Sequence, residues 1–239
     1  MALAIVSGIG TLTDAIVAAI IAWRLREPAK SENYKITSFR GSFFWFFAIF
    51  VPFVIFMSGP LFIEDPVISG YGYTIGHIFL YLSTAAYIFA PFDVIAPERK
   101  KLPKIIAIFI VITMIPVTII NWMAYANGTS VPVYDNNVAL WNPPDLVSIY
   151  IPLVVGITYI IFGFGLFFYH SIKTQDEYLR KRSRLLAIGF LILGISGPIH
   201  DQKWGAIAPI IIGFADLLVA LAFIIIARAV LLKKQENTS

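Results

Sequence analysis

The sequence alternates between long apolar stretches and short polar ones. Each apolar stretch runs for about 20 residues, the length that a helix needs to cross the roughly 30 Å hydrocarbon core of a bilayer. Barrel strands are about ten residues long and alternate apolar with polar positions, whereas these stretches are continuously apolar. The pattern predicts an all-α integral membrane protein, a bundle of seven transmembrane helices at residues 2–23, 42–63, 73–96, 103–126, 146–171, 184–201 and 206–232.

The composition agrees with this prediction. Apolar residues make up 59% and charged residues 13% of the 239 residues, whereas soluble domains contain about 45–50% and 25%. The segments between the predicted helices are short, so we expect a single membrane domain over residues 1–239 and no soluble domain. The chain has no cysteine, which excludes disulfides and thiolate metal ligands.

The basic residues predict the orientation. All but Lys203 of the 18 Lys and Arg residues fall on one side of the predicted helices. Because cytoplasmic loops carry the excess of Lys and Arg, we expect the N-terminus outside and the C-terminus in the cytoplasm, in a multi-pass protein of the cell membrane. The net charge of +4 then reflects topology and contact with membrane lipids. No motif for nucleic-acid binding is present, so DNA and RNA are not expected partners.

Two carboxyl groups lie near the middle of predicted helices, Asp14 in the first and Asp216 in the last. An ionisable residue inside a membrane is costly and is by default a functional hypothesis. Each aspartate lies on a helix face of small or polar residues, which is typical of closely packed membrane helices. Since the first and last helices of a seven-helix ring are commonly neighbours, we expect the two carboxyl groups to face the interior and each other, with one of them holding a proton. The alternative is that each carboxyl only bonds a helix carbonyl for packing.

The third predicted helix has a polar face. His77, Tyr81 and Thr84 follow the spacing i, i+4, i+7, with His77 one turn from the predicted outer surface. His200 lies near the outer end of the sixth predicted helix. Two histidines from two helices are able to ligate haem b axially or to bind a divalent metal. The alternative is a pair of interfacial histidines that bond loop carbonyls.

Two further surfaces are candidates for modification or binding. Asn127-Gly128-Thr129 is a glycosylation sequon on the predicted outer side, although so short a motif also arises by chance. A basic cluster precedes the sixth predicted helix and is expected to contact anionic lipid or a cytoplasmic or membrane protein partner. Its members are Arg180, Lys181, Arg182 and Arg184. A partner is expected because the chain has no effector domain, and a homo-oligomer is also compatible with the pattern.

Residues 216–228 resemble the last helix of microbial rhodopsins, through Asp216 and the apolar positions that follow it as far as Arg228. The resemblance implies a lysine four residues after the aspartate to hold retinal, but this chain has Ala220 there. Covalent retinal is therefore not expected. The layout of seven helices with an outer N-terminus also resembles prokaryotic seven-helix sensor modules, which indicates a fold and says little about function.

Three functions are compatible with these observations. The first is a non-enzymatic, sensor-like or receptor-like protein, in which Asp14 and Asp216 couple an outer-side ligand or a proton to helix movement. The second is a small transporter or proton-linked channel that uses the same two aspartates. The third is a membrane subunit of a redox complex, with haem or quinone near His77 and His200.

Overall fold

The computed structural model describes residues 5–26, 34–59, 65–135, 138–141, 143–199 and 208–232. Nearly all of them are helical, which confirms the prediction of an all-α chain. The exception is one short hairpin. The α-helices are α1 (Ile5–Arg26), α2 (Tyr34–Ser58), α3 (Pro66–Tyr87), α4 (Phe89–Ile95), α5 (Lys101–Ala126), α6 (Asp145–Ile151), α7 (Leu166–Lys173), α8 (Glu177–Ile199) and α9 (Ala208–Leu231). Two π-helical segments, η2 (Pro152–Gly156) and η3 (Tyr159–Gly165), lie between α6 and α7, and the hairpin consists of β1 (Val133–Asp135) and β2 (Val138–Leu140).

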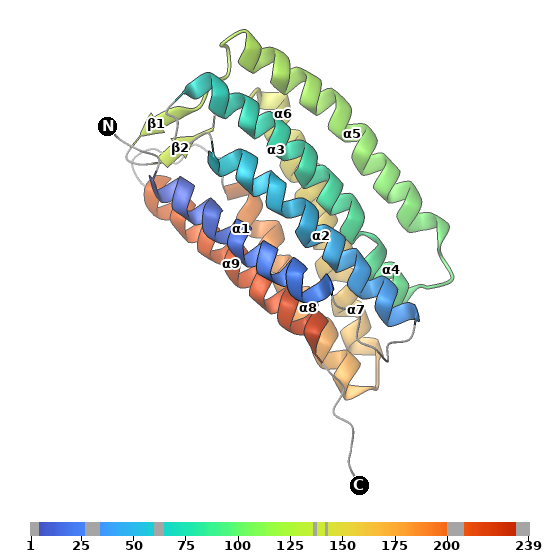
Figure 1. The fold of residues 1–239 in the computed structure, drawn as a ribbon. Coiled ribbons are helices and arrows are strands. Elements are labelled where there is room, and N and C mark those ends of the chain that lie inside the picture. Colours follow the sequence, from blue (N-terminus) through green and yellow to red (C-terminus); the bar gives the residue numbers. More distant parts are fainter. Residues whose placement is uncertain are drawn as a thin grey trace.

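The helices lie side by side in one elongated bundle (Figure 1). Helix α1 packs between α2 and α9, α9 packs on α8, and α3 packs between α2 and α5. Strands β1 and β2 pair antiparallel, with Val133 opposite Leu140. The hairpin lies at the end of the bundle where α1 begins, and β2 contacts both α1 and α9 (Figure 1). We refer to this end as the hairpin end and to the opposite one as the basic end.

Five stretches of the described chain are long and apolar enough to cross a membrane, judged by length and composition. They are Ser38–Ser58, Pro66–Ile95, Lys101–Ala126, Asp145–Lys173 and Ile210–Leu231. Helices α1 and α8 carry more charge, since α1 contains Asp14 and ends on basic residues, and the first turns of α8 hold the basic cluster. The bundle is thus compatible with a multi-pass membrane protein.

The outward faces of the bundle are apolar. On α5, the side chains of Ile105, Ile108, Phe109 and Ile112 are each about 60% exposed. Soluble monomers rarely expose contiguous apolar patches of this kind. A lipid environment accounts for the pattern, because it leaves an apolar outward face favourable.

The interior is built from aromatic rings. Phe46 of α2 is fully buried, and its ring centroid lies within 6.3 Å of rings from four other segments: Tyr87, Tyr159, Phe190 and Phe223. Edge-to-face and tilted pairs of this kind add about 0.5–1.5 kcal/mol each beyond the apolar area that they bury. Aromatic side chains of α2 therefore join α3, η3, α8 and α9 in one core.

Several elements begin elsewhere than the hydropathy pattern predicts. Helix α3 begins at Pro66, whereas the pattern places its start at residue 73. Asp65 caps it, with Oδ1 accepting hydrogen bonds from the backbone N–H groups of Val67 (2.8 Å) and Ile68 (3.1 Å), and proline suits the first helical position. Helix α2 begins at Tyr34 instead of residue 42. The hairpin also falls in a stretch, 127–145, where the sequence predicts only a loop.

Candidate functional site

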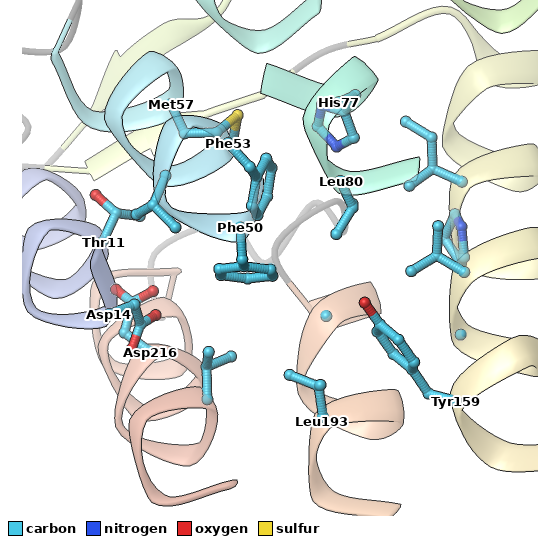
Figure 2. Close-up of a pocket in the computed structure, with 17 residues that line it drawn as sticks. Thr11, Asp14, Phe50, Phe53, Met57, His77, Leu80, Tyr159, Leu193 and Asp216 are labelled. Atoms are coloured by element: carbon cyan, nitrogen blue, oxygen red, sulfur yellow. The ribbon is translucent and has the colours of Figure 1, made fainter. Parts of the chain in front are cut away.

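A cavity of about 110 Å³ lies within the bundle, where α1, α2, α3, α8 and α9 meet the π-helical segments (Figure 2). Its walls are mostly apolar and aromatic. The lining includes Phe50, Phe53, Val54, Met57, Leu80, Ile151, Pro152, Val155, Gly156, Leu193, Gly197 and Val219, together with the polar side chains of Thr11, Asp14, His77, Tyr159 and Asp216. A few polar groups on an apolar wall are typical of small-molecule sites.

The cavity is small. Water occupies about 30 Å³ per molecule in the liquid, and an apolar cavity of about 150 Å³ binds benzene. The space therefore suits a few water molecules or a compact organic molecule. Pockets for drug-sized ligands are larger, at about 300–1,000 Å³.

The two aspartates meet on one wall of this cavity. Asp14 comes from α1 and Asp216 from α9, each is only 4% exposed, and their carboxyl groups lie next to each other (Figure 2). Oδ1 of Asp14 is buried and has no hydrogen-bond partner among the described residues. Burying a polar group without a partner is unfavourable, so a hydrogen-bond donor beside this oxygen would be stabilising.

Close packing of α1 on α9 brings the aspartates together. Gly10 of α1 lies against the Asp216 side chain, and a Cβ atom at position 10 would come within 2.5 Å of Asp216 Cγ. Glycine is the residue that allows such an approach. Gly10 lies one turn before Asp14 on the same face of α1, and the sequence reasoning did not single it out.

His77 lies deeper in the bundle than the sequence predicts. Because α3 begins at Pro66, His77 is three turns into the helix, about 16 Å along its axis. Its Nδ1 bonds the carbonyl oxygen of Tyr73 at 2.8 Å. A carbonyl only accepts, so Nδ1 carries the proton, and Nε2 is left for another partner. The imidazole packs between the rings of Tyr73 and Phe53, with centroid distances of 4.0 and 5.5 Å.

The other polar residues of α3 have different environments. Thr84 donates to the Leu80 carbonyl (2.8 Å), and its hydroxyl lies 2.9 Å from that of Tyr159, which lines the cavity. Thr84 thus reaches the cavity through Tyr159. Tyr81 is buried but does not line the cavity.

The haem or metal site expected at His77 and His200 stays a prediction. His200, the expected partner of His77, lies outside the described residues. In the described part of the chain, no group of three or more His, Asp or Glu side chains could hold a metal ion. The cavity beside His77, at about 110 Å³, is also far smaller than a porphyrin.

The sequence reasoning missed the wall formed by η2 and η3. Pro152, Val155 and Gly156 of η2 and Tyr159 of η3 all line the cavity. A π-helix has one extra residue in a turn, and such segments occur frequently at functional sites. The available signal was proline followed by glycine in the middle of an apolar stretch, since Pro152 removes a backbone donor within the helix.

The basic cluster divides into two parts. Lys181 and Arg184 are exposed and Arg180 is half-buried. Arg182 is only 8% exposed: its guanidinium lies 4.2 Å from the ring centroid of Phe39 and donates a hydrogen bond to the Val230 carbonyl at 3.3 Å. This corrects the grouping of Arg182 with the partner-contacting residues, because its side chain joins α8 to α2 and α9.

The sequon is at the hairpin end. Asn127 is exposed just after the last turn of α5, and the Thr129 hydroxyl donates to the Ala124 carbonyl at 2.9 Å. The side chain of Asn127 is thus accessible, and its glycosylation remains a prediction.

Comparison of the chain with known protein families, with curated proteins and with solved structures finds no match. The geometry of the cavity is therefore the basis for a function.

Proposed function

We propose that this chain is a non-enzymatic seven-helix protein of the cell membrane, sensor-like or receptor-like, with its N-terminus outside and its C-terminus in the cytoplasm. The central cavity binds a compact ligand that presents a positive charge or a hydrogen-bond donor to Asp14 and Asp216. The observation that carries the proposal is the pair of carboxyl groups on one wall of an otherwise apolar cavity. A carboxyl pair favours a cation or a donor, because carboxylate oxygens only accept.

The opposite wall supports a route for transmission. Tyr159 lies on η3, which continues directly into α7. Helix α7 ends at Lys173, and three residues separate it from the start of α8 at Glu177. Movement of the π-helical wall would therefore reach the basic residues Arg180, Lys181 and Arg184. These are the proposed contacts for a cytoplasmic or membrane partner.

A thermal-shift assay on the purified protein tests ligand binding. The probes are pyrrolidine, which is cationic at neutral pH, and tetrahydrofuran, its neutral ring analogue. We expect pyrrolidine to raise the melting temperature more than tetrahydrofuran, since a ligand that binds only the folded state stabilises it. The effect is expected to disappear in Val219→Phe, which fills the cavity, and to persist in Leu221→Phe on the outward face of the same helix. Equal shifts in both variants would argue against binding in the cavity.

Pulsed electron paramagnetic resonance tests transmission. The chain has no cysteine, so labels can be attached to Lys101→Cys and Lys181→Cys without further changes. We expect the distance between these labels to change on addition of saturating pyrrolidine. The control pair, Lys101→Cys with Met123→Cys, lies on α5 alone and should not change. Binding without any change in the first pair would contradict the sensor-like function.

A second candidate is a proton-linked transporter or channel. It is favoured by the meeting of Asp14, Asp216 and His77, from three helices, at one cavity within the bundle. Proton flux into liposomes, followed with a pH-sensitive dye, would be abolished by Asp216→Asn if this candidate is correct. Absence of flux in the wild type would exclude it.

A further inference from the structure

A groove of about 630 Å³ runs along the outer surface between α1 and α9, toward the basic end. Helix α1 contributes positions 17, 20, 21 and 24, and α9 contributes positions 224, 227, 228 and 231. Both sets follow the helical spacing i, i+3, i+4, i+7, so each is one continuous face. This groove is separate from the central cavity, with which it shares no lining residue.

The groove changes character along its length. Most of its lining consists of Val, Ile, Leu and Ala side chains, of which Ile20 and Ile224 are each more than half exposed. At its basic end the lining is Arg24 and Arg228, and no carboxylate of a described residue lines the groove. Both arginines are exposed, and neither forms a hydrogen bond or ion pair with a described residue. An apolar channel that ends at two exposed arginines complements an amphiphile with an anionic head.

The neighbouring residues indicate the depth of the arginines. Trp23 is 63% exposed, and the Arg26 guanidinium lies 4.0 Å from its ring centroid. Exposed tryptophan is typical of the headgroup level of a membrane. From Val17 to Arg24 the helix rises about 10 Å, roughly a third of the hydrocarbon core. The groove therefore spans the upper part of one acyl chain, with Arg24 at the level of the phosphate.

We infer that the groove binds one anionic phospholipid, with an acyl chain along Val17, Ile20 and Ile224 and the headgroup phosphate between Arg24 and Arg228. Guanidinium groups suit this role, because their fixed N–H donors match phosphate oxygens. The inference requires the bundle to lie in a membrane, as proposed above, but does not depend on what the central cavity binds. The site would place a regulatory lipid on the same helix pair that brings Asp14 and Asp216 together.

Native mass spectrometry of the full-length protein tests the inference, with phosphatidylglycerol and phosphatidylcholine of matched chains as the probes. We expect one phosphatidylglycerol to be retained under activation that strips phosphatidylcholine. Each basic residue near a membrane surface contributes to the free energy of attraction for anionic lipid. Loss of two such residues should therefore weaken phosphatidylglycerol binding roughly 30-fold. The double variant Arg24→Gln/Arg228→Gln should show this loss. The control Arg26→Gln removes a charge at the same end of α1, but Arg26 does not line the groove. This variant should bind phosphatidylglycerol nearly as well as the wild type does.

A second pair of variants separates the groove from general charge attraction. Ile20→Trp fills the groove and leaves both arginines in place, so it should also lose the retained lipid. Ile16→Trp, equally exposed on α1 but outside the groove, should keep it. Retention of both lipids alike, or of phosphatidylglycerol by the double variant or by Ile20→Trp, would overturn the inference. Melting temperatures in phosphatidylcholine nanodiscs show that each variant is folded.

Discussion

The carboxyl group of Asp216 on α9 occupies the space beside Gly10 of α1 where a side chain at position 10 would begin. The two helices therefore meet through a glycine backbone and an acidic side chain. Because Asp14 lies one turn further along α1, the same contact places the second carboxyl beside the first. The contact that packs α1 on α9 thus also positions the two carboxyl groups of the cavity.

The Gly10 contact predicts a specific steric effect. Gly10→Ala would push the Asp216 side chain out of its place, and overpacking of this kind costs about 1–3 kcal/mol. A lower melting temperature and a loss of pyrrolidine binding are the expected results. Gly41→Ala is the matched control, since no atom lies within 4 Å of a Cβ there; it should be neutral or stabilising. Equal melting temperatures for both variants would contradict the close packing of α1 on α9.

The proximity of Asp14 and Asp216 predicts non-additive substitutions. Either Asp14→Asn or Asp216→Asn alone already relieves the repulsion between the two carboxyl groups. The stability gained by the double variant should therefore be smaller than the sum of the gains in the two single variants. Residues in contact show coupling of about 0.5–3 kcal/mol. Denaturation of the four proteins in detergent gives this value. The control cycle combines Asp14→Asn with Asp93→Asn on α4, where additivity within about 0.5 kcal/mol is expected.

Two buried tyrosines predict opposite responses to loss of the hydroxyl. Tyr159→Phe removes the 2.9 Å hydrogen bond to Thr84 and should destabilise the protein by about 0.5–1.5 kcal/mol. The hydroxyl of Tyr87, whose ring centroid is 5.6 Å from that of Tyr159, is buried without a hydrogen-bond partner among the described residues. Tyr87→Phe should therefore be neutral or stabilising. Thermal unfolding of the two variants compares them directly, and a more damaging Tyr87→Phe would refute this assignment.

The basic cluster predicts a contrast between adjacent residues. Arg182→Gln removes the contact with Phe39 and the hydrogen bond to Val230, so we expect a loss of about 2–3 kcal/mol in the free energy of unfolding. Lys181→Gln changes an exposed side chain and should stay within about 0.5 kcal/mol of the wild type. Partner binding should show the reverse dependence, with Lys181 the more important residue once folding is accounted for.

The sequence by itself determined that the chain is helical and compatible with a membrane. It also indicated Asp14 and Asp216 as candidate functional residues. Both follow from local chemistry: an apolar run of about 20 residues satisfies its backbone only as a helix in lipid, and a carboxyl inside such a run is costly. The sequence did less well at the ends of helices. The start of α3 at Pro66 depends on the Asp65 cap, which lies in a stretch whose glycines and acidic residues suggest a loop.

Only the tertiary structure decided what these residues do together. Tyr159, Gly10 and the π-helical wall have no distinctive composition, and they matter because helices distant in sequence bring them to one cavity. The same is true of Arg182, which has the sequence surroundings of Lys181 but points toward Phe39 instead of outward. Hydropathy describes each helix alone, whereas contacts such as these depend on which faces of which helices meet.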